Sequence, residues 1–292
     1  MPLKTKLVTL TAALFFVVTS GFAQIKSGSN QPGDTSIVTD EGIAVTPSSI
    51  RLFLRPGETV TKEIRVTNKT KKTYSFSVAF NDFEMGENGK PKALDSLSRK
   101  YALSKWAIAS PSFFDIKPGE VQKVVLTVTI PDDESGKVAG WTIMSIDQVV
   151  KRDQITTAST EAKSVALGII PSFGFGIYVY QNPPDAGAPQ LEIQKFEKAS
   201  DGKDAEKRLQ LFVKSSGNAI GFCQTYIELT NTSTGEFVKL PVRNFTILPG
   251  FERVIYFSLP TSMPKGKYSV IAVVDYGSKE DMKAAEMDLT VE

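Results

Sequence analysis

A Pro-Gly turn followed by a run of alternating side chains occurs three times in this chain. The copies are Arg55-Pro56-Gly57-Glu58, Lys117-Pro118-Gly119-Glu120 and Leu248-Pro249-Gly250. Proline presets the first corner of a type II turn, and glycine takes the positive φ that the second corner requires. The segment after each turn alternates with a period of two, which is typical of a half-buried β-strand.

The second and third copies continue in the same way, so the chain contains an internal repeat. Their strands end at Ile130-Pro131 and Leu259-Pro260, and after a polar stretch new strands begin at Gly140 and Gly266. A turn-strand-turn-strand unit that occurs twice predicts two domains of one type, without long amphipathic helices. The predicted fold class is all-β: two immunoglobulin-like antiparallel β-sandwich domains in tandem, with about seven strands each.

Residues 1–23 have the pattern of a secretory signal peptide. Lys4 and Lys6 precede an apolar core, and small residues lead to Ala23. The apolar core is shorter than the roughly 20 residues that cross a bilayer comfortably. No cysteine lies at the cleavage point, and no later stretch has the pattern of a transmembrane helix. We expect a soluble protein that is periplasmic or otherwise exported and is not a lipoprotein; the alternative is a buried N-terminal strand or an uncleaved anchor.

Composition divides the rest of the chain into four segments. Residues 24–41 are rich in Ser, Gly, Asp and Pro and are expected to be a flexible lead. The first sandwich is expected over residues 42–182 and the second over residues 190–292. Between them, residues 183–189 form a short Pro/Gly linker that would hold two domains at a limited angle.

The residue types present exclude several classes of function. The chain has no histidine and one cysteine, so catalytic triads and zinc sites that need histidine cannot form, nor can thiolate cages. Removing Lys4 and Lys6 reduces the 34 basic residues to 32, which equals the 32 acidic residues. No basic stripe with interleaved aromatics is present, which argues against nucleic acid as a partner. We therefore expect no enzyme activity, no cofactor, no metal and no small-molecule substrate.

Three features allow more than one interpretation. Cys223 lies at the start of a predicted strand, where a buried, inert thiol is expected rather than a reactive or dimerising one. The run Asp132-Asp133-Glu134 is expected to be a solvated turn, because it lacks the ligand spacing of an EF-hand calcium loop. Trp106 and Trp141 are compatible with carbohydrate binding, but aromatics in a sandwich usually pack in the core or across strands.

The first predicted sandwich resembles the periplasmic pilus chaperones. The resemblance lies in Ile43-Ala44-Val45-Thr46-Pro47-Ser48-Ser49-Ile50-Arg51-Leu52-Phe53-Leu54, in Lys62-Glu63-Ile64-Arg65-Val66-Thr67-Asn68 and in Ile130-Pro131-Asp132-Asp133-Glu134-Ser135. The same features resemble the chaperone-like domain of Gram-positive proteins that associate with cell-wall-binding surface proteins. Together with the Ala23-Gln24 junction, they are similar to Bacteroidetes-type exported proteins. The second domain resembles the family only as a generic sandwich.

The resemblance implies a partner-binding role for Arg51. This residue matches the arginine in the cleft of the chaperones, which anchors the terminal carboxylate of a pilus subunit. The lysine that accompanies it in the family lies on the last strand of the first domain. Here that strand, residues 173–180, has no lysine. Carboxylate anchoring by this chain is therefore an open question at the level of sequence.

A second group of candidate partner-binding residues is Val165, Leu167 and Ile169. They have the same parity as the apolar residues of the strand that follows, so one face would be apolar from end to end. Pro171 interrupts the run and cannot donate to a ladder, which favours an edge strand or a kink. Because pilus chaperones lend the corresponding segment to a subunit, we predict a stripe that faces a partner; the alternative is that all three fill the core of their own domain.

The sequence therefore predicts a non-catalytic, periplasmic chaperone-like protein that binds an exported surface or fimbrial protein. Binding would occur by β-strand augmentation, in which an edge strand forms main-chain hydrogen bonds with a strand of the partner. The alternative is a structural or adhesive immunoglobulin-like module of the cell envelope without chaperone activity. A third class, the accessory module of a carbohydrate-degrading enzyme, lacks the catalytic domain that it would accompany.

The first testable prediction concerns export. We expect cleavage after Ala23, because a charged start, an apolar core and small residues precede it. The intact mass of the protein recovered from the soluble envelope fraction measures this directly. A mature chain that still carries residues 1–23, or a protein found in the cytoplasm, would contradict the prediction.

Overall fold

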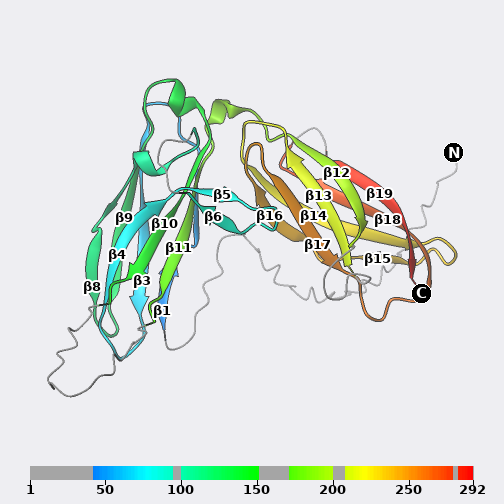
Figure 1. Ribbon diagram of the computed structural model, residues 1–292, viewed down its shortest axis with the longest axis horizontal. Helices are drawn as coiled ribbons and strands as arrows, with labels where there is room; N and C mark the ends of the chain where they lie inside the picture. The colour runs from blue at the N-terminus through cyan, green and yellow to red at the C-terminus, as the bar shows by residue number, and fades with distance from the viewer. Residues whose placement is uncertain (1–41, 95–99, 151–170, 200–207, 279–281, 292) are drawn as a thin grey trace, which may run out of the picture. The chain divides into compact units, whose positions relative to one another are not determined.

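The computed structural model describes residues 42–94, 100–150, 171–199, 208–278 and 282–291. The predicted signal peptide and flexible lead lie outside the described residues. The described residues form two β-sandwiches of the immunoglobulin-like type, which confirms the predicted fold class (Figure 1). Among them, no helix is long and apolar enough to cross a membrane.

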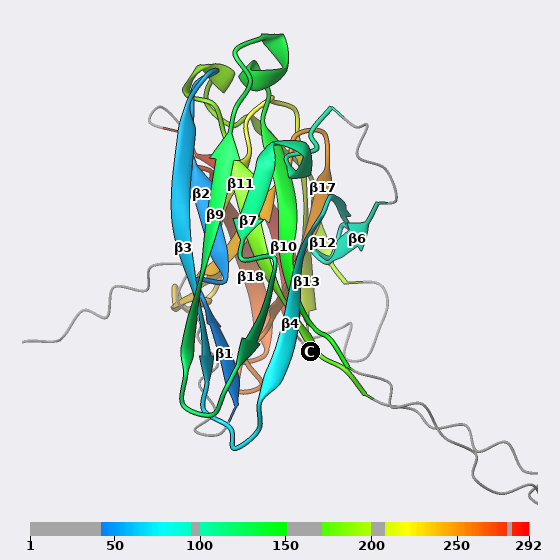
Figure 2. The same cartoon turned by 90° about the vertical axis from the view of Figure 1, so that its left-hand side faces the viewer.

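Two sheets pack face to face in the first sandwich. One sheet has the strand order β1-β3-β9-β7 and the other the order β2-β11-β10-β4-β8, while β5 and β6 form a separate hairpin (Figure 2). The strands are β1 (Ile43–Thr46), β2 (Ser49–Leu52), β3 (Thr59–Asn68), β4 (Tyr74–Asn81), β5 (Phe83–Met85), β6 (Pro91–Ala93), β7 (Ala107–Ser110), β8 (Phe113–Ile116), β9 (Val121–Thr129), β10 (Gly140–Gln148) and β11 (Gly174–Gln181). Short 3-10 helices occur at η1 (Ser104–Trp106), η2 (Glu134–Lys137) and η3 (Pro184–Ala186).

The second sandwich has the same construction. Its sheets have the orders β12-β13-β17 and β15-β14-β18-β19, and β16 also pairs with β14. The strands are β12 (Leu191–Lys198), β13 (Arg208–Ser215), β14 (Gly221–Asn231), β15 (Phe237–Lys239), β16 (Arg243–Ile247), β17 (Glu252–Ser258), β18 (Gly266–Asp275) and β19 (Lys283–Val291).

Alternating side chains from the facing sheets fill each core. In the first sandwich β3 and β9 pair in register, and their inward side chains are fully buried. These side chains are Ile64, Val66, Val124, Leu126 and Val128. The inward residues of the second core include Leu209, Leu211, Val213, Ile227, Leu229, Val270 and Ala272. Burial of alternate positions is what the period-two patterns predicted.

The three Pro-Gly turns have the geometry that their sequence predicted. Gly57, Gly119 and Gly250 have φ values of 81°, 76° and 81°, in the region that glycine enters without steric cost. In every copy the N–H of the fourth residue donates to the C=O of the first at 3.1 Å. The carboxylates of Glu58 and Glu120 also accept the N–H of the first residue, at 2.7 and 2.8 Å. Each of these turns begins a strand.

A buried asparagine closes a turn at the end of a strand in each sandwich. The side-chain amide of Asn68 donates to the C=O groups of Lys72 at 2.7 Å and Ile116 at 3.1 Å. Its oxygen accepts the N–H and the hydroxyl of Thr70, at 2.9 and 2.7 Å. The side-chain oxygen of Asn231 accepts the N–H groups two and three residues further on, at 2.9 and 3.1 Å. These amides are therefore structural elements of the turns.

We expect Asn68→Ala to lower the free energy of unfolding by about 1–3 kcal/mol, because it leaves the buried C=O of Ile116 without its partner. Urea denaturation followed by circular dichroism measures the loss. Asn88→Ala is the matched control, since Asn88 accepts one N–H in an exposed turn. Equal denaturation midpoints for the two variants would contradict a structural role for Asn68.

Candidate partner-binding site

The last strand of the first sandwich is paired along only half of one edge. On one side β11 pairs with β10 from Gly174 to Gln181. On the other side β2 pairs in parallel with its second half, and the N–H of Tyr178 donates to the C=O of Ser48 at 3.1 Å. Among the described residues, no strand pairs with this edge over residues 174–177. Because main-chain groups repeat every two residues, the N–H and C=O of Gly174 and Gly176 face the open edge.

The two faces of β11 have different neighbours. Ile177 and Val179 are fully buried in the first core, and Phe175 packs against it. The opposite face begins with two glycines and ends with Tyr178 and Tyr180, whose parallel rings are 6.0 Å apart. In the open half of the strand, the side chains of Phe175 and Ile177 therefore pack against the core on one face, while Gly174 and Gly176 place no side chains on the other face.

An open groove of about 760 Å³ lies beside the paired half of β11. Residues of both sandwiches line it. They include Ser48, Ser49, Arg51, Tyr178 and Tyr180 from the first sandwich, and Phe222, Gln224, Asn244, Arg253 and Asp275 from the second. The groove thus combines two guanidinium groups and the carboxylate of Asp275 with amide, hydroxyl and aromatic side chains.

Arg51 projects into this groove from β2. Its position on the strand is opposite Tyr180 of β11, and its guanidinium carbon lies 3.9 Å from the ring centroid of Phe222. A cation over an aromatic face is attracted by the ring quadrupole. Partial burial lowers the pKa of the guanidinium, and the phenol of Tyr180 opposes this shift. Within the described residues Arg51 forms no ion pair with a carboxylate.

A second arginine reaches the groove from the other sandwich. The Nε of Arg253, on β17, donates to the C=O of Glu87 at 3.3 Å, and its Nη1 contacts Met85 Sδ at 3.2 Å and the C=O of Thr246. A Cβ atom at Gly89 would lie 2.2 Å from Arg253 Nη2, so a larger residue at this position would displace the guanidinium. Burial lowers the pKa of Arg253, with opposing effects from nearby phenol and thiol groups. Arg253 therefore ties the β5–β6 hairpin to the second sandwich.

The charges of both guanidinium groups influence the pKa of the Tyr180 phenol. Burial is the main cause that raises its pKa above the ordinary value, and Tyr178 adds to the effect. The positive charges of Arg253 and Arg51 both act in the opposite direction. Among the described residues that line the groove, two guanidinium groups, of Arg51 and Arg253, thus outnumber one carboxylate, of Asp275.

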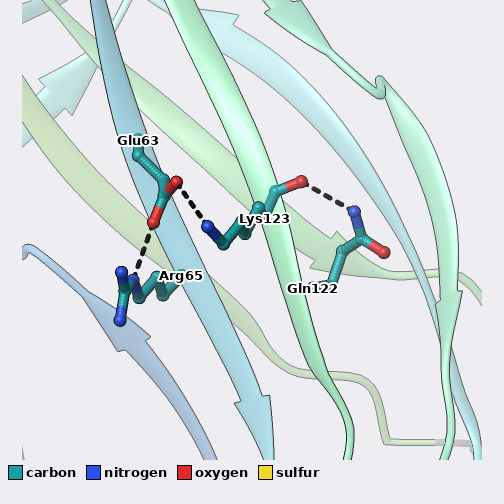
Figure 3. Close-up of polar contacts among 4 residues, drawn as sticks. All are labelled: Glu63, Arg65, Gln122 and Lys123. Carbon is teal, nitrogen blue, oxygen red and sulfur yellow. Dashed lines mark hydrogen bonds and ion pairs between the residues drawn. The ribbon is translucent and has the colours of Figure 1, made fainter.

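Two basic side chains on the outer face of the first sandwich share one acidic partner. On the outer face of β3 and β9, Glu63 accepts Arg65 Nε at 2.7 Å and Lys123 Nζ at 3.0 Å (Figure 3). The hydrogen bond from Arg65 is the main cause that lowers the pKa of Glu63. The same figure shows Gln122 donating to the C=O of Lys123. Arg65 thus has an acidic partner, whereas Arg51 has none among the described residues.

No protein-family model and no curated protein matches the sequence. Similar solved structures include a chaperone-tip adhesin complex of CFA/I fimbriae biogenesis. Its TM-score is 0.44 and its sequence identity 15%, and the match covers 84% of this chain and 98% of that one. The class 5 fimbriae chaperone CfaA has a TM-score of 0.43 and 14% identity, with 86% of this chain and 100% of that one covered. The E. coli chaperone DraB has a TM-score of 0.39 and 13% identity, with 85% of this chain and 98% of that one covered. The function of this chain therefore has to be inferred from its own residues.

Of the four predicted site residues, the structure describes only Arg51. Arg51 lines the groove, whereas Val165, Leu167 and Ile169 lie outside the described residues. Sequence reasoning missed Arg253, which the sequence shows only as one polar position in a strand after a turn. Its place in the groove depends on the packing of the two sandwiches, which no local pattern encodes.

Two further residues agree with their expected structural roles. Trp141 is 3% exposed, and its Nε1–H donates to the C=O of Phe83 at 2.7 Å. This confirms the core interpretation for Trp141. Asp133 accepts the N–H of Ser135 at 2.8 Å and caps η2. Within the described residues, no group of three acidic, cysteine or histidine side chains is arranged to hold a metal ion.

Cys223 is buried, as predicted, and burial is the main cause that raises its pKa to about 12. A thiol with a raised pKa stays protonated at pH 8, and the thiolate is the reactive form. We therefore expect the folded protein to react with Ellman's reagent far more slowly than the same protein in denaturant. Reaction of the folded protein at the rate of an exposed thiol would contradict a buried, inert Cys223.

Proposed function

We propose that this chain is a non-catalytic, exported chaperone-like protein that binds an exported surface or fimbrial partner by β-strand augmentation. The observation that carries the proposal is the open edge of β11 over residues 174–177. An extended segment of a partner can extend the sheet there, because main-chain donors and acceptors already face outward. The sequence resemblance to pilus chaperones supports the same role.

Arg51 supplies the proposed anchor at one end of this edge. The arginine and the open half of β11 belong to one sheet, since β2 pairs with the other half of that strand. A strand added along residues 174–177 leads toward the groove that Arg51 lines. Arg51 forms no ion pair with a described carboxylate, and a guanidinium is suited to bind the carboxylate of a partner, because their charge-assisted hydrogen bonds can be bidentate.

Val165, Leu167 and Ile169 are proposed as the second part of the contact. They precede β11 in the chain and have the parity of Phe175 and Ile177, which point into the first core. As a partner-facing stripe they would contribute apolar side chains next to the open edge. As core residues they would contribute only to stability.

We expect Arg51→Ala to weaken partner binding by about 2–5 kcal/mol, because it leaves the partner's carboxylate buried and unpaired. The partner is first identified by affinity purification from envelope extract with mass spectrometry. Its dissociation constant is then measured by calorimetry. Arg65→Ala is the matched control, since Arg65 is an exposed arginine with its own acidic partner. Unchanged affinity for Arg51→Ala, or an equal loss for both variants, would identify Arg51 as an ordinary surface arginine.

Leu167→Ala and Ile169→Ala distinguish a partner-facing stripe from a core segment. We expect partner binding to weaken while the melting temperature stays close to that of the unchanged protein. Ile177→Ala provides the comparison, because Ile177 is 1% exposed and such core truncations cost about 2–5 kcal/mol of stability. Melting curves beside partner pull-downs decide the matter. A drop in melting temperature as large as that of Ile177→Ala would exclude the partner-facing stripe.

A further inference from the structure

An acidic side chain lies over the open half of β11. Asp147 on β10 is paired with Gly174, and its exposed side chain is on the outer face of the sheet, because its neighbour Ile146 faces the core. A Cβ atom built at Gly174 would clash with Asp147 Oδ1 and lie 3.2 Å from Asp147 Cγ. The carboxylate of Asp147 therefore occupies the space that a side chain at Gly174 would take, on the side of the open edge.

The position of this carboxylate allows it to reach a strand added beside β11. The main-chain groups of Gly174 face the open edge, so Gly174 and Asp147 are a non-hydrogen-bonded pair, the kind in which side chains lie closer together. Neighbouring strands are about 4.8 Å apart, so the residue of an added strand that faces Gly174 lies about 10 Å from Asp147 in the same row. Gly174 has no side chain to fill this row. A lysine or arginine is long enough to meet the carboxylate across it.

Few charged side chains are present on the outer face of this sheet. In its described strands they are Arg51 on β2, Asp147 on β10 and Asp115 on β8. Asp115 accepts the hydroxyl of Ser75 at 2.5 Å. The strand order β11-β10-β4-β8 places Asp115 at the opposite edge of the sheet from β11. Asp147 is therefore the acidic residue of this face that lies next to the open edge.

Asp147 forms no ion pair with a described residue. The exposed lysines Lys71, Lys72 and Lys117 belong to turns beyond the ends of β4 and β8, and none of them is paired with it. Within the described residues, its charge is thus available to a cation of a bound segment.

Charges of opposite sign lie toward the two ends of β11. Arg51 is paired with Tyr180, and Asp147 is paired with Gly174, about 20 Å away along an extended strand. An extended segment with a carboxylate at one end and a cation toward the other matches both charges. The same segment in the reverse direction brings like charges together at each end. Complementary charges fix the register and direction of a bound segment in this way.

We propose that Asp147 determines which segment adds to β11, by binding a lysine or arginine of the added strand at the position that faces Gly174. This inference rests on the strand addition proposed above and adds the chemistry of the segment, which has a carboxylate near Arg51 and a basic residue near Asp147. The main-chain groups of Gly174 and Gly176 supply hydrogen bonds to any extended segment, whereas Asp147 selects its sequence and direction.

The test uses a short fluorescein-labelled peptide that alternates valine with threonine, has a lysine toward its amino end and keeps a free carboxylate at the other end. A second peptide has glutamate in place of the lysine. Fluorescence polarisation at low salt measures the binding of each peptide to the whole chain. We expect the lysine peptide to bind about tenfold more tightly, because Asp147 attracts the lysine and repels the glutamate. Added salt should reduce this ratio of affinities.

Two variants remove the proposed contact in different ways. Asp147→Asn removes the charge, and Gly174→Ala adds a Cβ that displaces the carboxylate. Each variant should bring the ratio of the two affinities toward one. Asp115→Asn is the matched control, because it removes an exposed carboxylate from the same face at the far edge of the sheet. This control should keep the ratio of the unchanged protein.

Hydrogen exchange separates this inference from the function on which it rests. We expect both peptides, at saturation, to slow exchange of the Gly174 and Gly176 amides. Such protection with a ratio near one, with a ratio that either variant leaves unchanged, or with an equal loss in Asp115→Asn would overturn the role of Asp147 and leave strand addition intact. Absence of binding and of protection for both peptides would contradict strand addition itself, and the role of Asp147 with it.

Discussion

The short segment of residues 43–52 is divided between the two sheets of the first sandwich, and this division determines how the edge of β11 is paired. β1 pairs with β3 in one sheet, and β2, three residues further on, pairs with β11 in the other. β2 is only four residues long, so it covers half of β11 and leaves the other half open. Main-chain donors and acceptors need partners, and no described strand supplies them to residues 174–177 on this side. The proposed function follows from that incomplete pairing.

The groove is connected to the same strand. Tyr178 and Tyr180 belong to the covered half of β11, and Arg51 is on the strand that covers it. Arg253 uses its donors on main-chain oxygens of Glu87 and Thr246, which fixes the β5–β6 hairpin against β17. The opposite wall of the groove is thereby preorganised, which reduces the conformational cost of binding.

Local pattern was enough to predict most of the fold. The Pro-Gly turns, the alternating strands and buried Cys223 each depend on residues close together in sequence. The half-covered β11 depends on the pairing of segments 43–52 and 174–181, which are distant in sequence. Arg253 is a similar case, because only the packing of the second sandwich brings it to the groove of Arg51. The sequence shows that β11, the last strand of the first sandwich, has no lysine. It does not show that Arg253 supplies a second cation to the groove.

Amide hydrogen exchange of the full chain, with and without the purified partner, tests strand addition most directly. In the free protein the N–H groups of Gly174 and Gly176 face the open edge, whereas those of Phe175 and Ile177 face β10. The account predicts that binding slows exchange at the two glycines and changes it little at the other two residues. Protection elsewhere in the chain, with unchanged exchange at Gly174 and Gly176, would contradict β-strand augmentation along β11.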